Sequence, residues 1–562
     1  MTQSNARRKF IRNFSLGTVA VSTIPLTACG GDDASYEPIT YAHGVASGDP
    51  LADRVILWTR ISAPAGADDL DVGWSVAEDS GFTKVVASGS TRTGASRDFT
   101  VKVDATGLAA NRRYFYRFRC QGIDSPVGRT KTLPTGSVTQ ARFAVFSCSN
   151  YPAGYFNVYG DAATFDDIDV GLHLGDYIYE YAAGGYASQN AAAMGRVSQP
   201  ATEIITLTDY RRRYQQYRTD PDLQAVHARM PFITVWDDHE LTNDTWRDGA
   251  ENHDPATEGL WAARRQMAIQ AYHEWMPIRQ PDAARPERIY RSFDFGNLLS
   301  LHMLDTRVIG RDKQLAYAGY VGADRSFNAA AFTADVTNPA RQLMGAEQTT
   351  WLQGQMAKST ATWQVLGQQV LMARMMLPAP MVLGTVGYAA YFAIAAKVQA
   401  GVALSETEQQ QLAAAPVPYN LDAWDGYAAA RETVLNMART LNKNLVVLAG
   451  DTHNAWASDL ADANGQAVGV EFGVPSVTSP GFEGYFPTAA PTTVAAAMEQ
   501  LIGPLQYAET ASRGFVVLTV TPAETRAEYR YVDTIRSQTY KASVGKVLRM
   551  LPGASNRKLV AG

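Results

Sequence analysis

Cysteine is scarce in this chain. Only Cys29, Cys120 and Cys148 occur among 562 residues. Small secreted proteins without a large core are held together by several disulfides, and this class is excluded because three thiols form one bond at most. With 46% hydrophobic residues, a chain of this length can bury a large core, and its length predicts two domains.

The chain also lacks an excess of basic residues. Its 50 Lys and Arg are outnumbered by 55 Asp and Glu, which gives a formal net charge of −5. Removal of residues 1–28, which carry four bases and no acid, takes this charge to −9. A mildly acidic mature chain has no polybasic surface for nucleic acid, so we expect no nucleic-acid-binding domain.

Long uninterrupted hydrophobic runs are missing as well. Residues 375–396 carry no charge and are as long as a membrane span, which needs ~20 residues. However, Pro378, Pro380, Gly384 and Gly387 interrupt the segment. A crossing here would also separate the site residues described below. We therefore expect an apolar helix and loop that lies over the site and could also touch lipid.

The first residues form the pattern of an export signal. The pair Arg7-Arg8 is followed by a short, interrupted apolar run, which predicts a twin-arginine signal peptide over residues 1–28. The sequence ending at Cys29 resembles a lipobox, in which this thiol is acylated; cleavage near Ala28 without lipid is the alternative. Residues 29–40 read as a flexible linker. We expect a periplasmic or cell-surface protein that contacts the membrane only through such a lipid. Because this pathway carries folded proteins, it favours a bound metal.

Short alternating strands dominate residues 41–134. Apolar and polar residues alternate over 55–60, 71–76 and 113–118, and turn residues separate these runs. The pattern predicts an immunoglobulin-like β-sandwich. Cys120 ends one of its strands and is interpreted as a buried thiol.

Residues 137–562 alternate apolar strands with helical patterns, which predicts an α/β domain. Open sheets bind ligands at the carboxyl ends of their strands. Four strands end there in metal-ligand types: 143–146 before Cys148, 170–174 before Asp176, 232–235 before Asp238, and 445–448 before Asp451 and His453. One such end can be a helix cap, but four in the same register indicate a shared site. The basic, amphipathic residues 536–559 predict a C-terminal helical segment that acts as a lid or caps the sheet.

These motifs resemble those of the calcineurin-like metallophosphatases. They comprise Cys148-x-Asn150, Gly-Asp176-x-x-Tyr179, Asp238-His239-Glu240 and Gly-Asp451-x-His453. The superfamily usually has Asp-x-His in the first motif, Asn in the third and a His pair in the last. The departures seen here match the PhoD-like alkaline phosphatases, and the resemblance covers nearly the whole mature chain.

The resemblance implies a four-layer α/β/β/α catalytic domain that holds iron and calcium and hydrolyses phosphate esters. The chemistry of the side chains agrees, because thiolate, phenolate and carboxylate suit a trivalent ion, whereas oxygen-only ligands suit Ca²⁺. The expected Fe³⁺ ligands are Cys148, Asp176, Tyr179 and His453, and those of Ca²⁺ are Asp176, Asp238 and Asp451, with Asn150 as a weaker candidate.

In such a site a metal-bound hydroxide attacks phosphorus in line. His239, next to a metal carboxylate, can protonate the leaving alkoxide; a role as a ligand or in orienting a ligand is the alternative. Arg307 follows a strand and suits bidentate phosphate binding, although an ion pair with Asp305 or its neighbours is an equal interpretation. His173 and His302 lie inside apolar strands and are interpreted as core histidines.

The sequence therefore predicts a secreted, monomeric alkaline phosphatase that acts on small phosphomonoesters and also on phosphodiesters. One alternative is a phospholipase D-like phosphodiesterase that acts on phospholipid or teichoic-type polymers, which only residues 375–396 and the lipobox support. The other is a non-catalytic surface protein, which the full ligand set and His239 disfavour.

Overall fold

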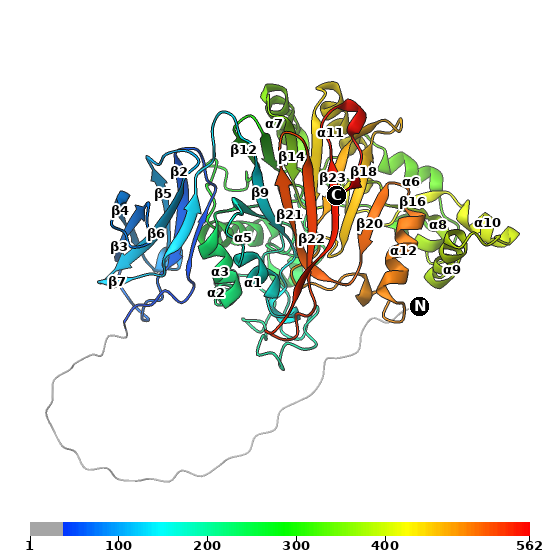
Figure 1. The fold of residues 1–562 in the computed structure, drawn as a ribbon. Coiled ribbons are helices and arrows are strands. Elements are labelled where there is room, and N and C mark those ends of the chain that lie inside the picture. Colours follow the sequence, from blue (N-terminus) through cyan, green and yellow to red (C-terminus); the bar gives the residue numbers. More distant parts are fainter. Residues whose placement is uncertain (1–37) are drawn as a thin grey trace, which may run out of the picture. The chain divides into compact units, whose positions relative to one another are not determined.

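The computed structural model describes residues 38–562. The predicted signal peptide 1–28, the lipobox at Cys29 and most of the linker 29–40 lie outside the described residues. In the described part, two large β-sheets lie face to face and helices cover their outer faces (Figure 1).

The larger sheet has ten strands and a parallel centre. Strands β9, β10 and β11 run parallel, and β21 pairs antiparallel with β9. In spatial order the strands are β24 (Val560–Ala561), β23 (Ala542–Met550), β22 (Thr525–Val532), β21 (Arg513–Val520), β9 (Ala141–Phe146), β10 (Val170–His173), β11 (Phe232–Thr234), β1 (Val45–Gly48), β2 (Arg54–Arg60) and β5 (Thr100–Thr106).

The smaller sheet has seven strands, of which the central four, β13, β14, β17 and β19, run parallel. In spatial order they are β12 (Arg291–Phe295), β13 (Leu299–Met303), β14 (Trp363–Gly367), β17 (Asn444–Ala449), β19 (Ala467–Gly473), β18 (Ala455–Ala461) and β20 (Leu505–Glu509).

Side-chain alternation along the strands separates the layers. In β9, Phe143 and Val145 pack into the core between the sheets, while Ala144 and Phe146 face the helices on the other side. The helices over the larger sheet are α1 (Asn157–Ala163), α2 (Leu207–Arg218), α3 (Pro221–Arg229) and α5 (Trp261–Trp275); those over the smaller sheet are α7 (Gly345–Lys358), α9 (Tyr388–Gln399), α11 (Ala428–Thr440) and α12 (Pro491–Leu501). The predicted α/β/β/α arrangement is confirmed.

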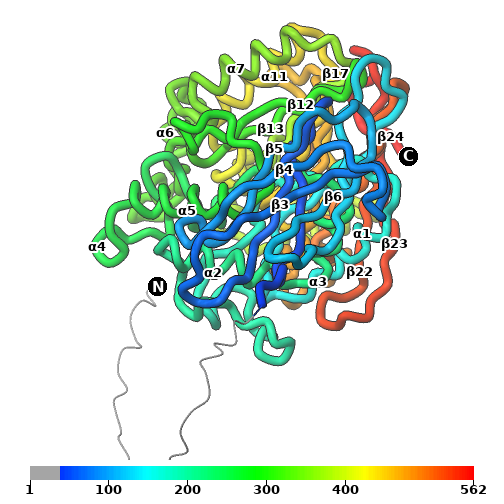
Figure 2. The backbone as a smooth tube through the Cα atoms, turned by 90° about the vertical axis from the view of Figure 1, so that its left-hand side faces the viewer, coloured from blue at the N-terminus to red at the C-terminus, as the bar shows by residue number. Residues whose placement is uncertain are grey.

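The predicted N-terminal all-β domain is also confirmed, and its strands face the viewer in Figure 2. A five-stranded sheet packs on β1, β2 and β5 around a core that includes Leu57, Val72 and Phe118. It contains β3 (Leu70–Ala77), β4 (Val85–Thr93), β6 (Arg113–Cys120), β7 (Ile123–Asp124) and β8 (Gly128–Lys131). Cys120 is a buried free thiol, as predicted.

The two domains share a sheet, which the sequence does not indicate. Strand β1 pairs in parallel with β11, with Gly48 opposite Phe232. A Cβ at Gly48 would lie 2.1 Å from the carbonyl oxygen of Pro277 and 2.6 Å from that of Phe232. This junction therefore requires glycine.

The predicted C-terminal helical segment is wrong. Residues 542–550 form strand β23, which pairs antiparallel with β22, and only the 3₁₀ turn Ala554–Asn556 is helical in this stretch. The sheet offers backbone partners to this segment, and they override its helical amphipathicity.

Residues 375–396 form a broken apolar segment. They contain β15 (Met376–Pro378), α8 (Ala379–Val382) and the start of α9. Within residues 38–562, no helix is both long and apolar enough to cross a membrane. The remaining α-helices are α4 (Pro255–Glu258), α6 (Ala329–Val336) and α10 (Glu406–Leu412), and the remaining strand is β16 (Pro416–Pro418), the partner of β15.

Candidate active site

The candidate ligands lie at the carboxyl ends of strands from both sheets. Strands β9, β10 and β11 of the larger sheet lead to Cys148, Asp176 and Asp238, and β17 of the smaller sheet leads to Asp451 and His453. One ligand atom from each of Cys148, Asp176 and His453 lies within 4.8 Å of the others, and so do atoms of Asp237, Asp238 and Asp451. The structure thus brings together residues that are up to 305 positions apart in the sequence.

The backbone is strained at these strand ends. Cys148, Asp176, Asp451 and His453 have φ angles of 61°, 56°, 63° and 64°. Residues other than glycine seldom adopt the left-handed region, which costs of order 1–3 kcal/mol each and is concentrated at functional sites. Four such residues in one place indicate that the turns are built to aim these side chains.

The first group of candidate ligands comprises Cys148, Asp176 and His453, and Tyr179 joins it through its hydroxyl. The Tyr179 hydroxyl donates to Asp176 Oδ2 at 3.0 Å and lies 3.2 Å from His453 Nε2. Ser479 Oγ donates to the same hydroxyl at 2.7 Å. Burial raises the pKa of the Cys148 thiol well above its ordinary value, and Asp176 raises it further. A thiolate here therefore needs a neighbouring cation.

His453 is oriented as a metal ligand. Its Nδ1 lies 2.9 Å from the carbonyl oxygen of Pro480, which accepts the ring proton, so that Nε2 keeps its lone pair on the side of Tyr179. Burial lowers the pKa of His453 to about 3, which keeps the imidazole neutral. Ligating histidines commonly have their ring orientation fixed in this way.

The second group contains carboxylate oxygens without partners. Asp176 Oδ1, Asp237 Oδ2 and Asp238 Oδ1 are buried and have no hydrogen-bond partner among the described residues. The same holds for the amide oxygen of Asn150, whose nitrogen donates to the Tyr186 carbonyl at 3.3 Å. Buried anionic oxygens are costly unless paired or bound to cations. The donor set therefore fits metal ions.

Asp237 is a site residue that the sequence analysis missed. It precedes Asp238 in the Trp-Asp-Asp-His-Glu run, and this position was the available signal. Its carboxylate joins the group of Asp238 and Asp451.

Glu240 fixes the turns of the site. Its carboxylate accepts the backbone N–H groups of Asp176 at 3.0 Å, Tyr177 at 2.7 Å and Asp237 at 2.8 Å. It thus ties the turn after β10 to the turn after β11.

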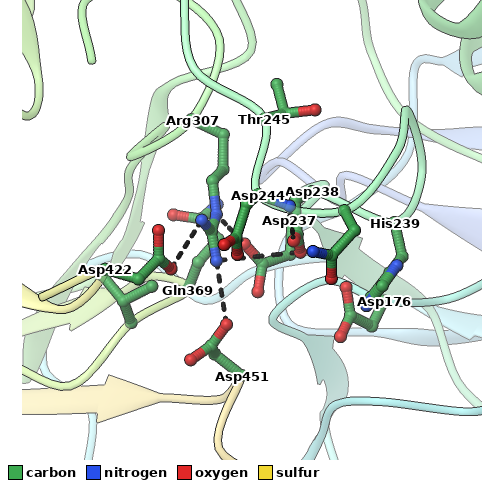
Figure 3. Close-up of polar contacts among 12 residues, drawn as sticks. Asp176, Asp237, Asp238, His239, Asp244, Thr245, Arg307, Gln369, Asp422 and Asp451 are labelled. Atoms are coloured by element: carbon green, nitrogen blue, oxygen red, sulfur yellow. Dashed lines mark hydrogen bonds and ion pairs between the residues drawn. The ribbon is translucent and has the colours of Figure 1, made fainter. Parts of the chain in front are cut away.

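Arg307 lies at the centre of a carboxylate cluster (Figure 3). Its side chain is fully buried; Nη2 donates to Asp451 Oδ1 at 2.8 Å, Nη1 lies 2.7 Å from Asp422 Oδ2, and Nε donates to Asp237. Phosphate binding by Arg307 is not supported by this geometry, because carboxylates surround the guanidinium. The ion-pair interpretation describes it better, but the partners of the guanidinium are Asp237, Asp422 and Asp451, whereas Asp305 accepts the backbone N–H of Arg307 at 2.8 Å.

His239 is held by a carboxylate that the sequence analysis also missed. Its Nδ1 lies 2.6 Å from Glu180 Oε2, and its ring stacks on Tyr179 with 4.2 Å between centroids. Burial lowers the pKa of His239, but the Glu180, Asp238 and Asp176 carboxylates raise it well above its ordinary value. These carboxylates favour the protonated imidazole, in which Nδ1 donates to Glu180 and Nε2 is a second donor. Glu180 follows Tyr179 directly, which was the only signal in the sequence.

The two core histidines behave as predicted. His173 Nε2 lies 2.9 Å from the Tyr159 hydroxyl. His302 contacts Ser292 Oγ at 2.7 Å and Gln364 Oε1 at 3.0 Å. The Gly175 N–H donates to His173 Nδ1 at 3.3 Å, so both nitrogens of each buried ring have a partner.

Comparison with known proteins agrees with this geometry. Residues 143–529 match the family model described as PhoD-like phosphatase, and residues 28–134 match that of the PhoD-like phosphatase N-terminal domain. Alkaline phosphatase D of Bacillus subtilis (strain 168) is 36% identical over 553 residues, which are 94% of this chain and 85% of that protein. A solved structure titled "Structure of PhoD" is similar with a TM-score of 0.76 at 34% identity, and the match covers 95% of this chain and 94% of that one. The chain therefore belongs to the PhoD-like phosphatase family, whose members are phosphoric ester hydrolases.

Proposed function

We propose that this phosphatase hydrolyses phosphomonoesters, and phosphodiesters as well, at a centre that holds more than one cation. The observation that carries the proposal is the close approach of two donor groups, which Asp176 and Asp238 connect through a third group that also contains His239. One contains a thiol, a phenol and a neutral imidazole; the other contains carboxylates with unpartnered oxygens. Two adjacent cations suit phosphoryl transfer, because the attacking oxygen and the leaving oxygen on opposite sides of phosphorus both carry negative charge.

The donor chemistry assigns a metal to each group. Cys148, Asp176, Tyr179 and His453 would hold Fe³⁺, and the oxygen donors Asp176, Asp238 and Asp451, joined by Asp237, would hold Ca²⁺. When bound, such cations neutralise charge on the phosphoryl oxygens and make water a better nucleophile.

The chain's own residues supply the proton and the alignment. The protonated His239, fixed by Glu180 at 2.6 Å, carries a proton on Nε2 beside Asp238 and Asp176. We assign it the role of general acid for the leaving alkoxide. Arg307 neutralises the Asp237, Asp422 and Asp451 carboxylates and holds them in place.

Turnover of a matched ester panel by the purified holoenzyme tests the proposal. We expect release of inorganic phosphate from monoesters and cleavage of diesters, both dependent on Ca²⁺, with iron found by elemental analysis. Cleavage of phospholipid headgroups alone would instead assign the phospholipase D-like alternative. No activity on any ester with full metal content would refute the proposal.

Export is part of the proposal, and it rests on the twin-arginine pattern of residues 1–28. Cell fractionation of the full-length protein, compared with a variant in which Lys replaces both Arg7 and Arg8, tests it. We expect wild-type activity outside the cytoplasm and retention of the variant. An equal distribution of the two proteins would contradict export by this route.

A further inference from the structure

The loop of residues 480–486 is anchored directly on the metal-site histidine. The Pro480 carbonyl accepts from His453 Nδ1 at 2.9 Å, and the Phe482 N–H donates to Asn454 Oδ1 at 2.9 Å. The 3₁₀ helix η5 (Phe482–Gly484) follows, and the Tyr485 N–H donates back to the Phe482 carbonyl at 2.9 Å. This short, tied loop carries the Tyr485 side chain to the surface beside the site.

Tyr485 is 77% exposed although its neighbours are aromatic. Its ring centroid lies 6.2 Å from that of Phe482, and the Phe482 ring lies 5.9 Å from that of Tyr419. Phe482 and Tyr419 are half-buried, whereas the Tyr485 ring is left largely in solvent.

Tyr186 lies against the same histidine that anchors the loop of Tyr485. The Tyr186 hydroxyl lies 3.2 Å from His453 Nδ1, and its ring stacks on Tyr179 with 6.0 Å between centroids. The Tyr186 ring also lies 6.2 Å from the His453 ring between centroids. These four residues, Tyr186, Tyr419, Phe482 and Tyr485, are called the aromatic rim.

A substrate whose phosphate sits at the metal ligands must extend its alcohol part outwards. The aromatic rim lies beside His453, which Tyr186 contacts and which anchors the loop of Tyr485, and its outermost member is the exposed Tyr485. Aromatic faces stack on flat π-systems and do so with little dependence on hydrogen-bond pattern. The rim therefore suits a flat group in the alcohol part of the ester.

We propose that Tyr485 is a specificity-determining residue that stacks on a flat aromatic group, such as a nucleobase, in the alcohol part of the substrate. The inference rests on the proposed phosphoesterase function and specifies the substrate class of the same site. Stacking on Tyr485 would make nucleotide-type esters better substrates than esters of plain sugars or short alkyl alcohols.

Adenosine 5′-monophosphate and ribose 5-phosphate provide a matched pair, because both release a primary ribose 5-hydroxyl and differ in the base. For the wild type we expect a higher kcat/KM with the nucleotide. Tyr485→Ala should reduce this preference by about 5- to 150-fold, the range of base–aromatic stacking, mainly through KM. Tyr485→Phe, which keeps the ring, should retain the preference.

The binding constant of the non-hydrolysable methylenephosphonate analogue of the nucleotide, measured by calorimetry on the holoenzyme, gives a readout that does not need turnover. If neither ester is hydrolysed, the proposed function fails, but a weaker Kd in Tyr485→Ala and an unchanged Kd in Tyr485→Phe would still support the inference. Equal losses for both esters in Tyr485→Ala, an unchanged ratio, or no nucleotide preference in the wild type would overturn it.

Discussion

The Glu180–His239 pair provides the sharpest test of the acid role. Glu180→Gln keeps the shape of the side chain and an oxygen for the Asn243 N–H, which Glu180 Oε1 accepts at 2.8 Å, but removes the charge that holds the His239 proton. A buried hydrogen bond to a charged group contributes about 1.5–3 kcal/mol. If this stabilisation is lost from the transition state, kcat falls by about 10- to 150-fold. His239→Ala removes the proton donor itself and should cost about 10²–10⁴-fold.

The assay is kcat for a series of aryl and alkyl phosphate monoesters, with metal content measured for each variant. The losses of kcat in Glu180→Gln and in His239→Ala should both be largest for esters of alcohols with a high pKa. They should shrink for esters of acidic phenols, which leave without protonation. Glu251→Gln is the matched control: Glu251 is an exposed carboxylate that accepts from the Asn243 side chain at 3.0 Å and does not contact His239. Equal losses across the whole series, or loss of metal in His239→Ala, would refute the acid role and assign His239 to ligand duty.

Three further predictions follow from the donor groups and the buried histidines. A Ca²⁺-selective chelator should abolish turnover reversibly while iron stays bound; full recovery with Zn²⁺ alone would contradict this division. The holoenzyme should show a visible charge-transfer band that Tyr179→Phe and Cys148→Ser shift or bleach; a colourless, fully active enzyme would rule out ferric iron. Burial lowers the pKa of His43 and of His273 to about 3 in the folded protein. In the unfolded chain both histidines return to their ordinary pKa and bind protons below about pH 6.5. The stability that these neutral histidines provide is thus present above pH 6.5 and is lost as pH falls towards 3, by about 1.4 kcal/mol per histidine and pH unit. Urea unfolding midpoints that are equal at pH 7 and pH 5 would contradict it.

Local pattern predicts much of this structure because the ligands follow apolar strands. The strand before Cys148 and the strand before Asp176 each end within three residues of the ligand, so that the sheet edge brings the side chains together. The spacing of apolar residues predicts such strands, and with them the residues that directly follow each strand. The same holds for part of the N-terminal sandwich, where alternation and turn residues mark strands β2, β3 and β6.

The parts that escape prediction depend on contacts between distant segments. The pairing of β1 with β11 joins residues 48 and 232 through backbone groups and leaves no side-chain pattern. The C-terminal strand β23 is favoured by an available sheet edge rather than by its own propensity. In both cases the strand forms because another part of the fold offers a backbone partner.

Arg307 shows the same limit at the site itself. A strand-end arginine reads as a phosphate ligand because the sequence does not show which acids surround it. In the fold, Asp237 and Asp451 follow strands of different sheets, and Asp422 lies 115 positions beyond Arg307. A fully buried guanidinium needs such partners, since one unpaired charge at this depth would cost several kcal/mol. The arginine is thus part of the charge balance of the carboxylate group: it offsets the anions that would otherwise repel one another, while Asp176 Oδ1 and Asp238 Oδ1 have no hydrogen-bond partner among the described residues and are available to a cation.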